Sequence, residues 1–345
     1  MTHPRHDIIH AVETKMTKTL IAGLGSIGRR HLRNLVALGE TDIVLLRTHR
    51  ATLPEDEIAG YPVESDLALA LKRHKPEAVI VANPTALHMD VAIPAARADC
   101  AILLEKPISD STRRVRSLQS AAERHGGRLL VGFQFRFHPS ILCARQVIAD
   151  GMIGRIISAH VHFGEYLPAW HPWEDYRTGY AARSDLGGGV VRTQCHSLDY
   201  LPWLVGPAEA AWGLVGKLSD LEVDADDTAE VGLRFAGGAI GSLHLDYNQR
   251  PPSHSFDIIG TNGMLKCDMS DGTVNVYRAE AQQCDTYPLP AGWERNVMFM
   301  EEMRHFLAVA RGEQEPVCSL EDGLRVMRLI EAIHKSQNTG RLVKL

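Results

Sequence analysis

Residues 19–28 read TLIAGLGSIG, a short apolar run that breaks directly into a glycine turn. Residues 19–22 suit a buried strand of a parallel sheet, and Gly23, Gly25 and Gly28 have the spacing G-x-G-x-x-G at the start of a helical pattern. In such a turn the first glycine permits the tight bend, the second lets the backbone approach a pyrophosphate, and the third brings helix and strand together. The stretch therefore predicts the start of a dinucleotide-binding domain rather than an isolated loop.

Apolar runs and helical patterns continue to alternate up to residue 132. Helices are predicted over residues 26–38, 64–74, 91–98 and 111–125, and strands over residues 42–46, 78–82, 101–104 and 128–132. Repeated strand and helix units with short connections predict a doubly wound parallel sheet, with its functional loops at the C-terminal ends of the strands. The sequence thus predicts an α/β fold that begins with a Rossmann domain over residues 17–133, after a flexible tail of residues 1–16.

The composition excludes several classes of partner. The 345 residues have a net charge of −5, the 37 basic residues are scattered, and no apolar run reaches membrane-spanning length. The tail lacks the apolar core of a signal peptide, and the six cysteines show no C-x-x-C spacing, which is typical of reduced thiols. His3, His6 and His10 are interpreted as solvent-exposed rather than as metal ligands. We expect a cytoplasmic protein that binds no nucleic acid, no membrane and no metal.

The loop after the second strand bears on the choice of cofactor. Residues 42–46 are followed by Arg47, Thr48, His49 and Arg50, with no acidic residue. An acidic side chain about twenty positions past the glycine turn holds the ribose hydroxyls of NAD, whereas arginine suits a 2′-phosphate. NADP is therefore favoured, with NAD as the alternative. The competing interpretation is that these arginines only face solvent.

Two further strands are followed by polar residues. The sequence NPTALH (residues 83–88) follows one strand, and Glu105, Lys106 and Pro107 follow the next. The C-terminal ends of parallel strands border the ligand crevice, so Lys106 is a candidate for contact with cofactor and substrate. The alternative is a surface ion pair between Lys106 and Glu105.

The pattern changes beyond residue 133, where we expect a second domain over residues 134–345. A loop over residues 164–185 is rich in aromatic and hydrogen-bonding groups, a combination that proteins use to stack and orient polar rings such as sugars. Tyr166, Trp173 and Arg177 are its first candidates for substrate contact, against the alternative that they only support the loop.

A glycine-started helix is predicted next, over residues 186–206. At helical spacing Thr193, His196 and Asp199 share one side of it, so this polar stripe is expected to face the crevice. Further strands are predicted at 229–235, 239–246, 255–260, 264–268 and 274–277, as a meandering antiparallel sheet that helices over 296–311 and 320–336 would close.

The segments GLGSIG, NPTALH, LLEKPIS and GGGVVRTQCHSLDY, in this order, resemble the Gfo/Idh/MocA oxidoreductases over essentially everything from Lys18 onward. The resemblance implies a Rossmann domain followed by an α/β domain with a large, mostly antiparallel open sheet, sugar-like or nucleotide-linked substrates, and a homo-oligomer, either dimer or tetramer. Segments such as GEYLP and WHPWEDYR resemble the branch found in surface-polysaccharide or unusual-sugar pathways.

The resemblance also assigns roles to residues. It implies that Lys106 and His196 are catalytic and lie opposite each other, and that Thr193 contacts substrate although many relatives carry aspartate there. Together with the turn chemistry it predicts these cofactor-binding residues: Gly23, Gly25, Ser26, Ile27, Gly28, Arg47, Thr48, Arg50, Asn83, Pro84, His88, Glu105, Lys106 and Gln134.

The expected function is an NAD(P)-dependent oxidoreductase that moves hydride between the nicotinamide and a sugar hydroxyl or carbonyl. His196 would move the hydroxyl proton, and Lys106 would hydrogen-bond the same oxygen. Two alternatives stay open: a redox-neutral epimerase or eliminating enzyme that oxidises its substrate only transiently, and a sugar or nucleotide sensor without turnover.

Overall fold

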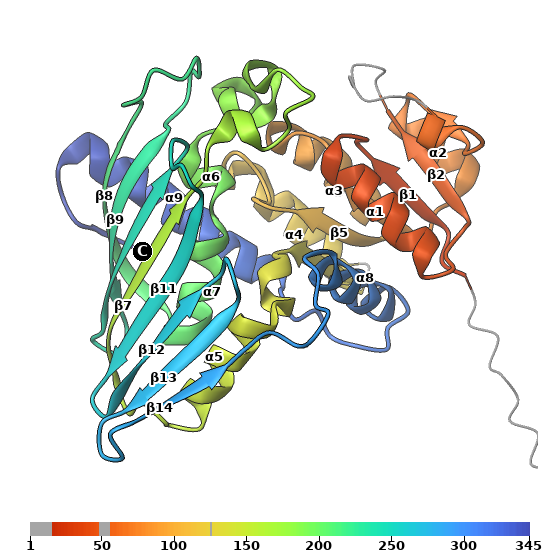
Figure 1. The fold of residues 1–345 in the computed structure, drawn as a ribbon. Coiled ribbons are helices and arrows are strands. Elements are labelled where there is room, and N and C mark those ends of the chain that lie inside the picture. The colour runs from red at the N-terminus through yellow and green to blue at the C-terminus, as the bar shows by residue number, and fades with distance from the viewer. Residues whose placement is uncertain (1–15, 48–55, 125) are drawn as a thin grey trace, which may run out of the picture.

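A computed structural model describes residues 16–47, 56–124 and 126–345. Two sheets dominate it, with helices packed between and around them (Figure 1). Residues 1–15 of the expected tail, together with Thr48 and Arg50, lie outside the described residues. No helix within the described ranges has both the length and the apolar character needed to cross a lipid bilayer.

The N-terminal sheet has six parallel strands in the order β3-β2-β1-β4-β5-β6, as a doubly wound domain requires. Its strands are β1 (Thr19–Ala22), β2 (Ile43–Leu46), β3 (Val63–Glu64), β4 (Ala78–Val81), β5 (Ala101–Glu105) and β6 (Leu129–Gly132). Its helices are α1 (Ser26–Ala37), α2 (Leu67–His74), α3 (His88–Arg97) and α4 (Val115–Arg124). Because β1 pairs with both β2 and β4, the strand order reverses at β1, directly below the glycine turn.

The C-terminal sheet has nine strands in the order β14-β13-β12-β11-β7-β10-β9-β8-β15. They are β7 (Ile156–Gly164), β8 (Ala208–Gly216), β9 (Thr228–Phe235), β10 (Ile240–Asp246), β11 (Ser253–Gly260), β12 (Gly263–Asp268), β13 (Thr273–Arg278), β14 (Gln283–Tyr287) and β15 (Val343–Lys344). The expected α/β class with a large, mostly antiparallel second sheet is confirmed. The sheet is not a simple meander, however, because β7 and β10 pair in parallel at its centre.

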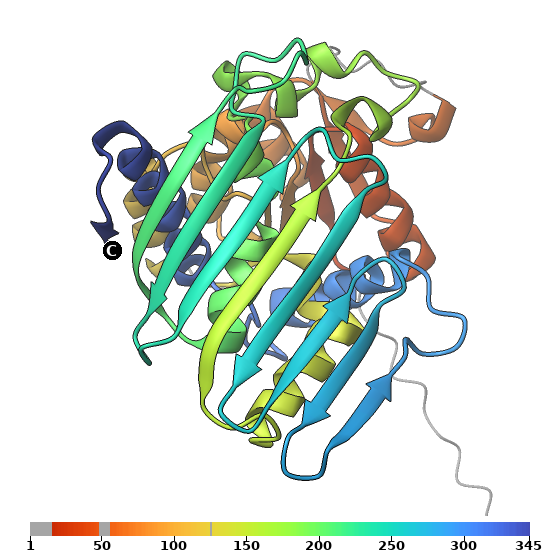
Figure 2. The same cartoon turned by 60° about the vertical axis from the view of Figure 1, so that its left-hand side comes forward.

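The two faces of the C-terminal sheet differ in chemistry. On β7 the side chains of Val161 and Phe163 are buried, whereas His160 and His162 alternate with them on the opposite face. The remaining helices are α5 (Pro139–Ala149), α6 (Val190–Thr193), α7 (His196–Val205), α8 (Asn296–Ala310) and α9 (Leu320–Thr339). Figure 2 shows the helices behind the sheet, while the face turned to the viewer carries none of the described helices. We call this uncovered side the outer face.

The two last long helices cover different sheets. α9 packs on β8 of the C-terminal sheet, but α8 returns to the N-terminal domain and packs on α1, β5 and β6. There the Arg30 guanidinium lies 4.5 Å from the centre of the Phe299 ring, and Asn296 donates to Asn34. The prediction that both helices close the antiparallel sheet is therefore wrong for α8.

The predicted single helix over residues 186–206 is also wrong, because it is two helices, α6 and α7, separated at Gln194 and Cys195. Gly187 and Gly189 have φ values of 83° and 105°, which are outside the helical region, so the glycines precede α6 rather than join it. At the break the Gln194 side chain donates 3.0 Å to the backbone carbonyl of Asp246 at the end of β10. This bond to the sheet sets the direction in which α7 starts.

Candidate active site

The two domains meet where β5 ends and α7 begins. Lys106 follows β5 directly, and its Nζ donates 3.1 Å to the backbone carbonyl of Thr193, the last residue of α6. His196 is the first residue of α7 and is 6% exposed. The structure thus brings the predicted pair together across the domain junction.

Lys106 is held as a cation. Burial lowers its pKa, but the surrounding groups Tyr180, Cys195, Glu105 and Glu165 outweigh burial, so the pKa of Lys106 lies above its ordinary value. An ammonium group at this position can donate to an oxygen atom that gains negative charge.

His196 is held neutral. Burial, followed by the charges of Lys106, His254 and Arg295, lowers the pKa of His196 well below its ordinary value. Its Nε2 lies 3.4 Å from the Nε2 of Gln134, and its Nδ1 is buried with no hydrogen-bond partner among the residues that the structure describes. A neutral imidazole with an open nitrogen can accept a proton, so the pair combines a base with a cation.

The glycine turn fits a dinucleotide. A Cβ on Gly23 would lie 2.5 Å from the backbone nitrogen of Asn83, and one on Gly28 would lie 2.0 Å from the carbonyl oxygen of Gly23. A Cβ on Gly25, by contrast, would meet no atom within 4 Å, so the backbone is open at the position where a pyrophosphate approaches. The N-terminus of α1 has no side-chain cap, which leaves the N–H groups around Ser26 and Ile27 available to an anion.

The loop after β4 is organised by His88. Its Nδ1 lies 3.0 Å from the carbonyl oxygen of Pro107 and its Nε2 lies 2.9 Å from that of Asn83, and the ring is 1% exposed. His88 therefore ties this loop to the one that carries Lys106 and does not present its ring to the crevice. Asn83 is half-buried with its Oδ1 unpartnered, and Pro84 beside it is half-buried as well.

Glu105 is turned inward. Its Oε1 lies 2.7 Å from Nε2 of the fully buried His31 on α1, so this atom does not form the surface ion pair with Lys106 that was the alternative interpretation. Burial would raise its pKa, but the hydrogen bond to His31 and the charges of His31 and Lys106 lower it overall. The side chain of Glu105 therefore links β5 to α1.

The two remaining predicted cofactor positions lie on different loops. Arg47 follows β2 and is 7% exposed, with its backbone N–H donating to Glu64. Gln134 begins the 3₁₀ turn Gln134–Phe137 and lies 5% exposed beside His196. Gln134 is therefore positioned at the junction rather than deep in the cofactor turn.

The predicted substrate residues separate into distinct environments. Tyr166 is half-buried and carries the Arg250 guanidinium 4.2 Å from its ring centre. Trp173 is 68% exposed, and Arg177 is engaged by Asp175 and Glu222. The buried Thr193 hydroxyl lies within hydrogen-bond range of the carbonyl of Gly189, just before α6, and of the Tyr247 hydroxyl, and the carbonyl of Thr193 accepts from Lys106.

The expected polar stripe of Thr193, His196 and Asp199 does not exist. Asp199 is 4% exposed and accepts two hydrogen bonds from Arg136, at 2.9 Å from Nε and 2.6 Å from Nη2. Arg136 also donates 2.7 Å to the carbonyl of Val317. Asp199 therefore holds α7 against the domain junction instead of facing the crevice.

Two charged residues at this site were missed from the sequence. Glu165 follows β7, and burial raises its pKa above the ordinary value although Arg295 and Lys106 lower it. Arg295 precedes α8, and its charge acts on His196, His254 and Glu165. The position of Glu165 beside Tyr166 at the end of a predicted strand could have indicated a site residue. No motif in the sequence around Arg295 indicates that it lies at the site.

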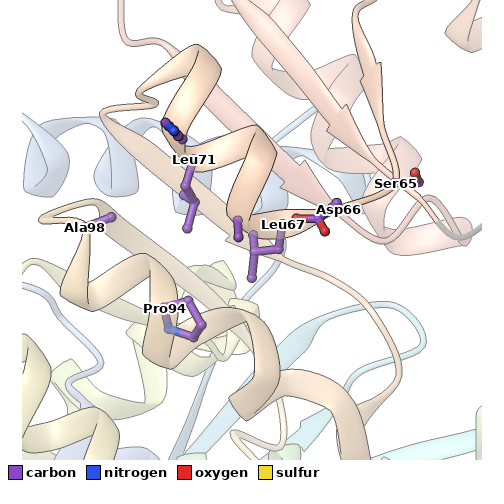
Figure 3. Close-up of a pocket in the computed structure, with 8 residues that line it drawn as sticks. Ser65, Asp66, Leu67, Leu71, Pro94 and Ala98 are labelled. Atoms are coloured by element: carbon purple, nitrogen blue, oxygen red, sulfur yellow. The ribbon is translucent and has the colours of Figure 1, made fainter.

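A separate hollow of about 650 Å³ lies on the N-terminal domain between α2 and α3, away from this junction. Figure 3 shows Leu67 and Leu71 of α2 facing Pro94 of α3 across it, with Ser65 and Asp66 at one end. None of the predicted site residues lines it, so the hollow is not the crevice.

Comparison with known proteins identifies the fold family. A family model described as the NAD-binding Rossmann fold of an oxidoreductase family matches residues 17–133, and its partner, described as the C-terminal alpha/beta domain, matches residues 145–345. The chain belongs to the Gfo/Idh/MocA family. It is therefore an oxidoreductase with an NAD-binding domain, as the resemblance implied.

Individual members of the Gfo/Idh/MocA family align over different lengths. A 2,7-anhydro-N-acetylneuraminate hydratase of Mediterraneibacter gnavus is 30% identical over 222 residues, which are 62% of this chain and 58% of that protein. A D-apiose dehydrogenase of Paraburkholderia graminis is 24% identical over 98% of this chain and 92% of its own. A solved levoglucosan dehydrogenase, in complex with NADH and levoglucosan, superposes with a TM-score of 0.82 at 22% identity over 96% of this chain and 99% of its own.

Proposed function

We propose that this protein transfers hydride between a nicotinamide cofactor and a hydroxyl or carbonyl carbon of a sugar-like substrate. The observation that carries the proposal is the junction of Lys106 and α7, where a cation from the Rossmann domain meets a neutral histidine from the second domain. The relatives named as sugar dehydrogenases support the substrate class.

Residues of the chain itself carry out the proton transfer. A bound nicotinamide would supply the acceptor or donor for the hydride at the substrate carbon. His196 takes the hydroxyl proton during oxidation and gives it back during reduction, because its neutral form is favoured. Lys106 donates a hydrogen bond to the same oxygen and stabilises its negative charge, because its ammonium form is favoured. Gln134, 3.4 Å from the histidine, orients the ring.

Gly23, Gly25, Gly28, Ser26 and Ile27 would hold the pyrophosphate at the start of α1. The preference for NADP rests on the arginines after β2: Arg47 is placed beside the strand end, while Thr48 and Arg50 lie outside the described residues. Asn83 and Pro84 would line the opposite side of the cofactor.

The test is steady-state absorbance of the reduced nicotinamide with a panel of sugars, acidic sugars and nucleotide sugars, each with NAD and with NADP. Net formation or loss of reduced cofactor with at least one substrate is expected. A protein that binds cofactor and sugar tightly but never changes this absorbance, and never converts the sugar, would instead be a sensor.

A redox-neutral reaction is the second candidate, and the relative named as a hydratase favours it. The same groups would serve it: oxidation would acidify the carbon beside the new carbonyl, and His196 could remove that proton once it has released the hydroxyl proton to solvent. Substrate conversion without net change in cofactor absorbance, together with solvent deuterium in the product, would identify this outcome.

We also propose a cytoplasmic homo-oligomer with a cofactor domain over residues 17–133 and a substrate domain over residues 134–345. The relatives are enzymes of carbohydrate metabolism, and the uncovered outer face offers a surface for subunit contact. Light scattering coupled to size exclusion measures the oligomeric state directly.

A further inference from the structure

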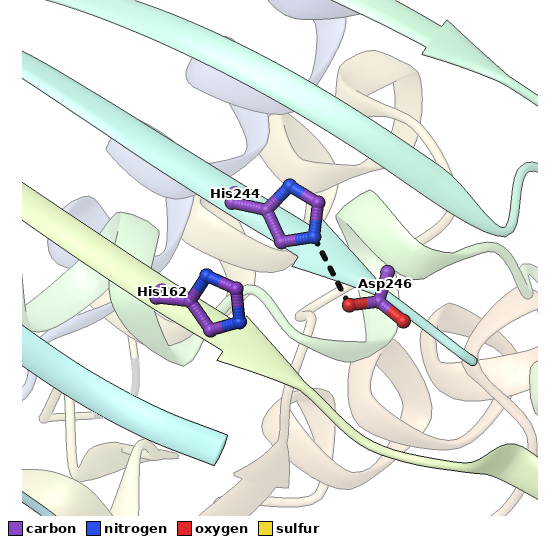
Figure 4. Close-up of side chains that lie close together, drawn as sticks. All are labelled: His162, His244 and Asp246. Atoms are coloured by element: carbon purple, nitrogen blue, oxygen red, sulfur yellow. Dashed lines mark hydrogen bonds and ion pairs between the residues drawn. The ribbon is translucent and has the colours of Figure 1, made fainter. Parts of the chain in front are cut away.

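The outer face of the C-terminal sheet holds a compact group of metal-ligand side chains outside the active site. His162 on β7 and His244 on β10 are directly opposite each other in the parallel register, and Asp246 lies two residues further along β10 on the same face. One donor atom from each of the three lies within 4.8 Å of the other two. Figure 4 shows the two imidazole rings one beside the other, with the carboxylate next to His244.

The donor atoms are already oriented by neighbouring groups. His244 Nδ1 lies 2.6 Å from the carboxylate of Glu230 on β9, which leaves Nε2 to face Asp246 at 3.0 Å. A metal-binding histidine commonly has its second nitrogen bonded to a carboxylate in this way. Asp246 is oriented similarly, because its Oδ1 accepts the backbone N–H groups of Asn248 and Gln249 and its Oδ2 remains for a ligand bond.

The three donor groups lie near enough for a zinc ion to reach them after rotation of the side chains. The rings of His162 and His244 are 4.7 Å apart between centres with an angle of 16° between their planes. Tetrahedral zinc with ligand bonds near 2.0–2.1 Å places its donor atoms about 3.3 Å apart. From the observed upper limit of 4.8 Å, this needs a contraction of roughly 1.5 Å at most, within reach of side-chain rotation. His162 Nε2 would exchange its 3.2 Å contact with Gln249 for the metal.

We propose that His162, His244 and Asp246 bind a divalent cation of the zinc type on the outer face of the sheet. Two imidazoles and one carboxylate favour zinc over magnesium or calcium, which prefer oxygen ligands. Three protein ligands leave a fourth position for water.

The cation would fix the sheet behind the active site. The carbonyl of Asp246 accepts from Gln194 at the break between α6 and α7, and from the backbone N–H of Glu165 at 3.1 Å. The neighbouring Tyr247 hydroxyl shares a hydrogen bond with Thr193. By linking the side chains at the end of the paired strands β7 and β10, the cation would further restrain both the loop that carries Glu165 and the start of α7.

The test measures zinc uptake by the purified full-length chain without an affinity tag, after chelator treatment. Because His3, His6 and His10 could bind metal on their own, the parent chain and every variant in this test carry alanine at these three positions. Loading is done above neutral pH, because a histidine must be unprotonated at the nitrogen that binds the metal. Calorimetry gives affinity and stoichiometry, and Co²⁺ reports four-coordination by its visible absorption.

One zinc ion per chain is expected, with uptake lost in His162→Ala and in His244→Ala. His160→Ala is the matched control, because His160 lies on the same face of β7 but bonds to Ser242, and it should bind zinc as the parent does. Glu230→Gln should keep the site and weaken it by about 10- to 100-fold, as loss of an orienting carboxylate does. A pair of adventitious surface histidines would not respond to that change.

The proposal fails if the folded parent takes up no zinc, or if His162→Ala and His244→Ala bind as tightly as the parent. Should either variant fail to fold, zinc-edge anomalous scattering from crystals of the parent decides. A peak between His162, His244 and Asp246 supports the site, and its absence at saturating zinc overturns it.

Discussion

Lys106 Nζ and the backbone carbonyl of Thr193 are joined by a hydrogen bond of 3.1 Å that crosses from the end of β5 to the end of α6. The bond aims the ammonium toward the segment that begins α7 and keeps it within range of His196. Lys106 and His196 are therefore each expected to affect the chemical step more than the binding of the cofactor.

Lys106→Ala and His196→Ala should each lower the turnover rate by about a hundredfold or more, while the affinity for cofactor changes only a few-fold. Single-turnover rates and cofactor titrations measure the two effects separately. Lys266→Ala and His160→Ala, both on the outer face, are the matched controls. Near-normal turnover in folded Lys106→Ala and His196→Ala would assign the proton transfer to other groups, with Glu165 the first to examine.

The pH dependence of alcohol oxidation should reflect the lowered pKa of His196. Protonated His196 cannot accept the hydroxyl proton, so kcat/KM is lost as pH falls through its pKa, and this acid limb should lie below pH 6.5. Arg295→Gln removes one of the charges that lower the pKa of His196, so the acid limb should move to higher pH. Arg234→Gln on the outer face serves as control. An acid limb at the same pH in Arg295→Gln and in the parent would show that another group controls it.

The loop after β2 is expected to set cofactor choice. Arg47→Asp should weaken NADP binding more than NAD binding, because a carboxylate repels the 2′-phosphate and can accept from a ribose hydroxyl. Fluorescence titration with both cofactors measures the ratio, and Arg116→Asp on α4 controls for net charge. A parent that binds NAD at least tenfold more tightly than NADP, a gap of about 1.4 kcal/mol, would contradict the arginine hypothesis.

The buried pair of Arg136 and Asp199 should dominate the stability of the domain junction. Burial raises the pKa of Asp199, but the hydrogen bonds from Arg136 oppose this, so removal of the arginine leaves an uncompensated carboxyl group. Arg136→Met is expected to lower the free energy of unfolding by about 3–5 kcal/mol, and Arg136→Met with Asp199→Leu should recover most of the loss. Denaturant unfolding measures both. Equal losses in the single and double variants would mean that the bond to Val317, not the ion pair, matters most.

Glu302 on α8 should make the protein less stable as the pH rises. Burial, followed by the charge of Glu105, raises the pKa of Glu302 well above its ordinary value, and neither carboxyl oxygen has a hydrogen-bond partner within the described part of the chain. The protonated carboxyl group of Glu302 stabilises the folded state at acid pH. This stabilisation declines as the pH rises from the pKa of Glu302 in the unfolded chain toward its higher pKa in the folded chain, by at most about 1.4 kcal/mol per pH unit.

Glu302→Gln should therefore flatten the dependence of unfolding free energy on pH over this range. Glu301→Gln, at the exposed neighbouring position, should leave it unchanged. An identical slope in Glu302→Gln and the parent would show that Glu302 is not the group that titrates.

The N-terminal domain could be predicted because its signals are local. Every strand except the two-residue β3 is a short, largely buried apolar run, and the spacing G-x-G-x-x-G identifies Gly23 and Gly28, where a side chain would clash with the backbone. In the C-terminal sheet, two strands were not predicted. The small residues of β8 (AEAAWGLVG) obscure its alternation, and β14 (QCDTY) is largely exposed.

The rest could not be predicted because it depends on distant partners. Asp199 follows the spacing of a crevice-facing stripe, yet Arg136, 63 residues away, turns it to the junction. The helix break depends on a bond from Gln194 to Asp246, 52 residues away. His162 and Glu230 likewise gain their neighbours only when the strands pair. Periodicity in the sequence indicates only which side chains share a face of one helix or strand. It does not predict these contacts, because each of them joins residues of different elements.

The return of α8 to the first domain limits how this gene can recombine with its relatives. A hybrid that joined residues 1–133 to the second half of another member would receive a foreign α8, which would have to fit Arg30, Asn34 and the buried surroundings of Glu105. Crossovers should therefore yield stable hybrids when residues 17–133 and 296–310 are inherited from the same parent, and the intervening sheet is the part that can be exchanged.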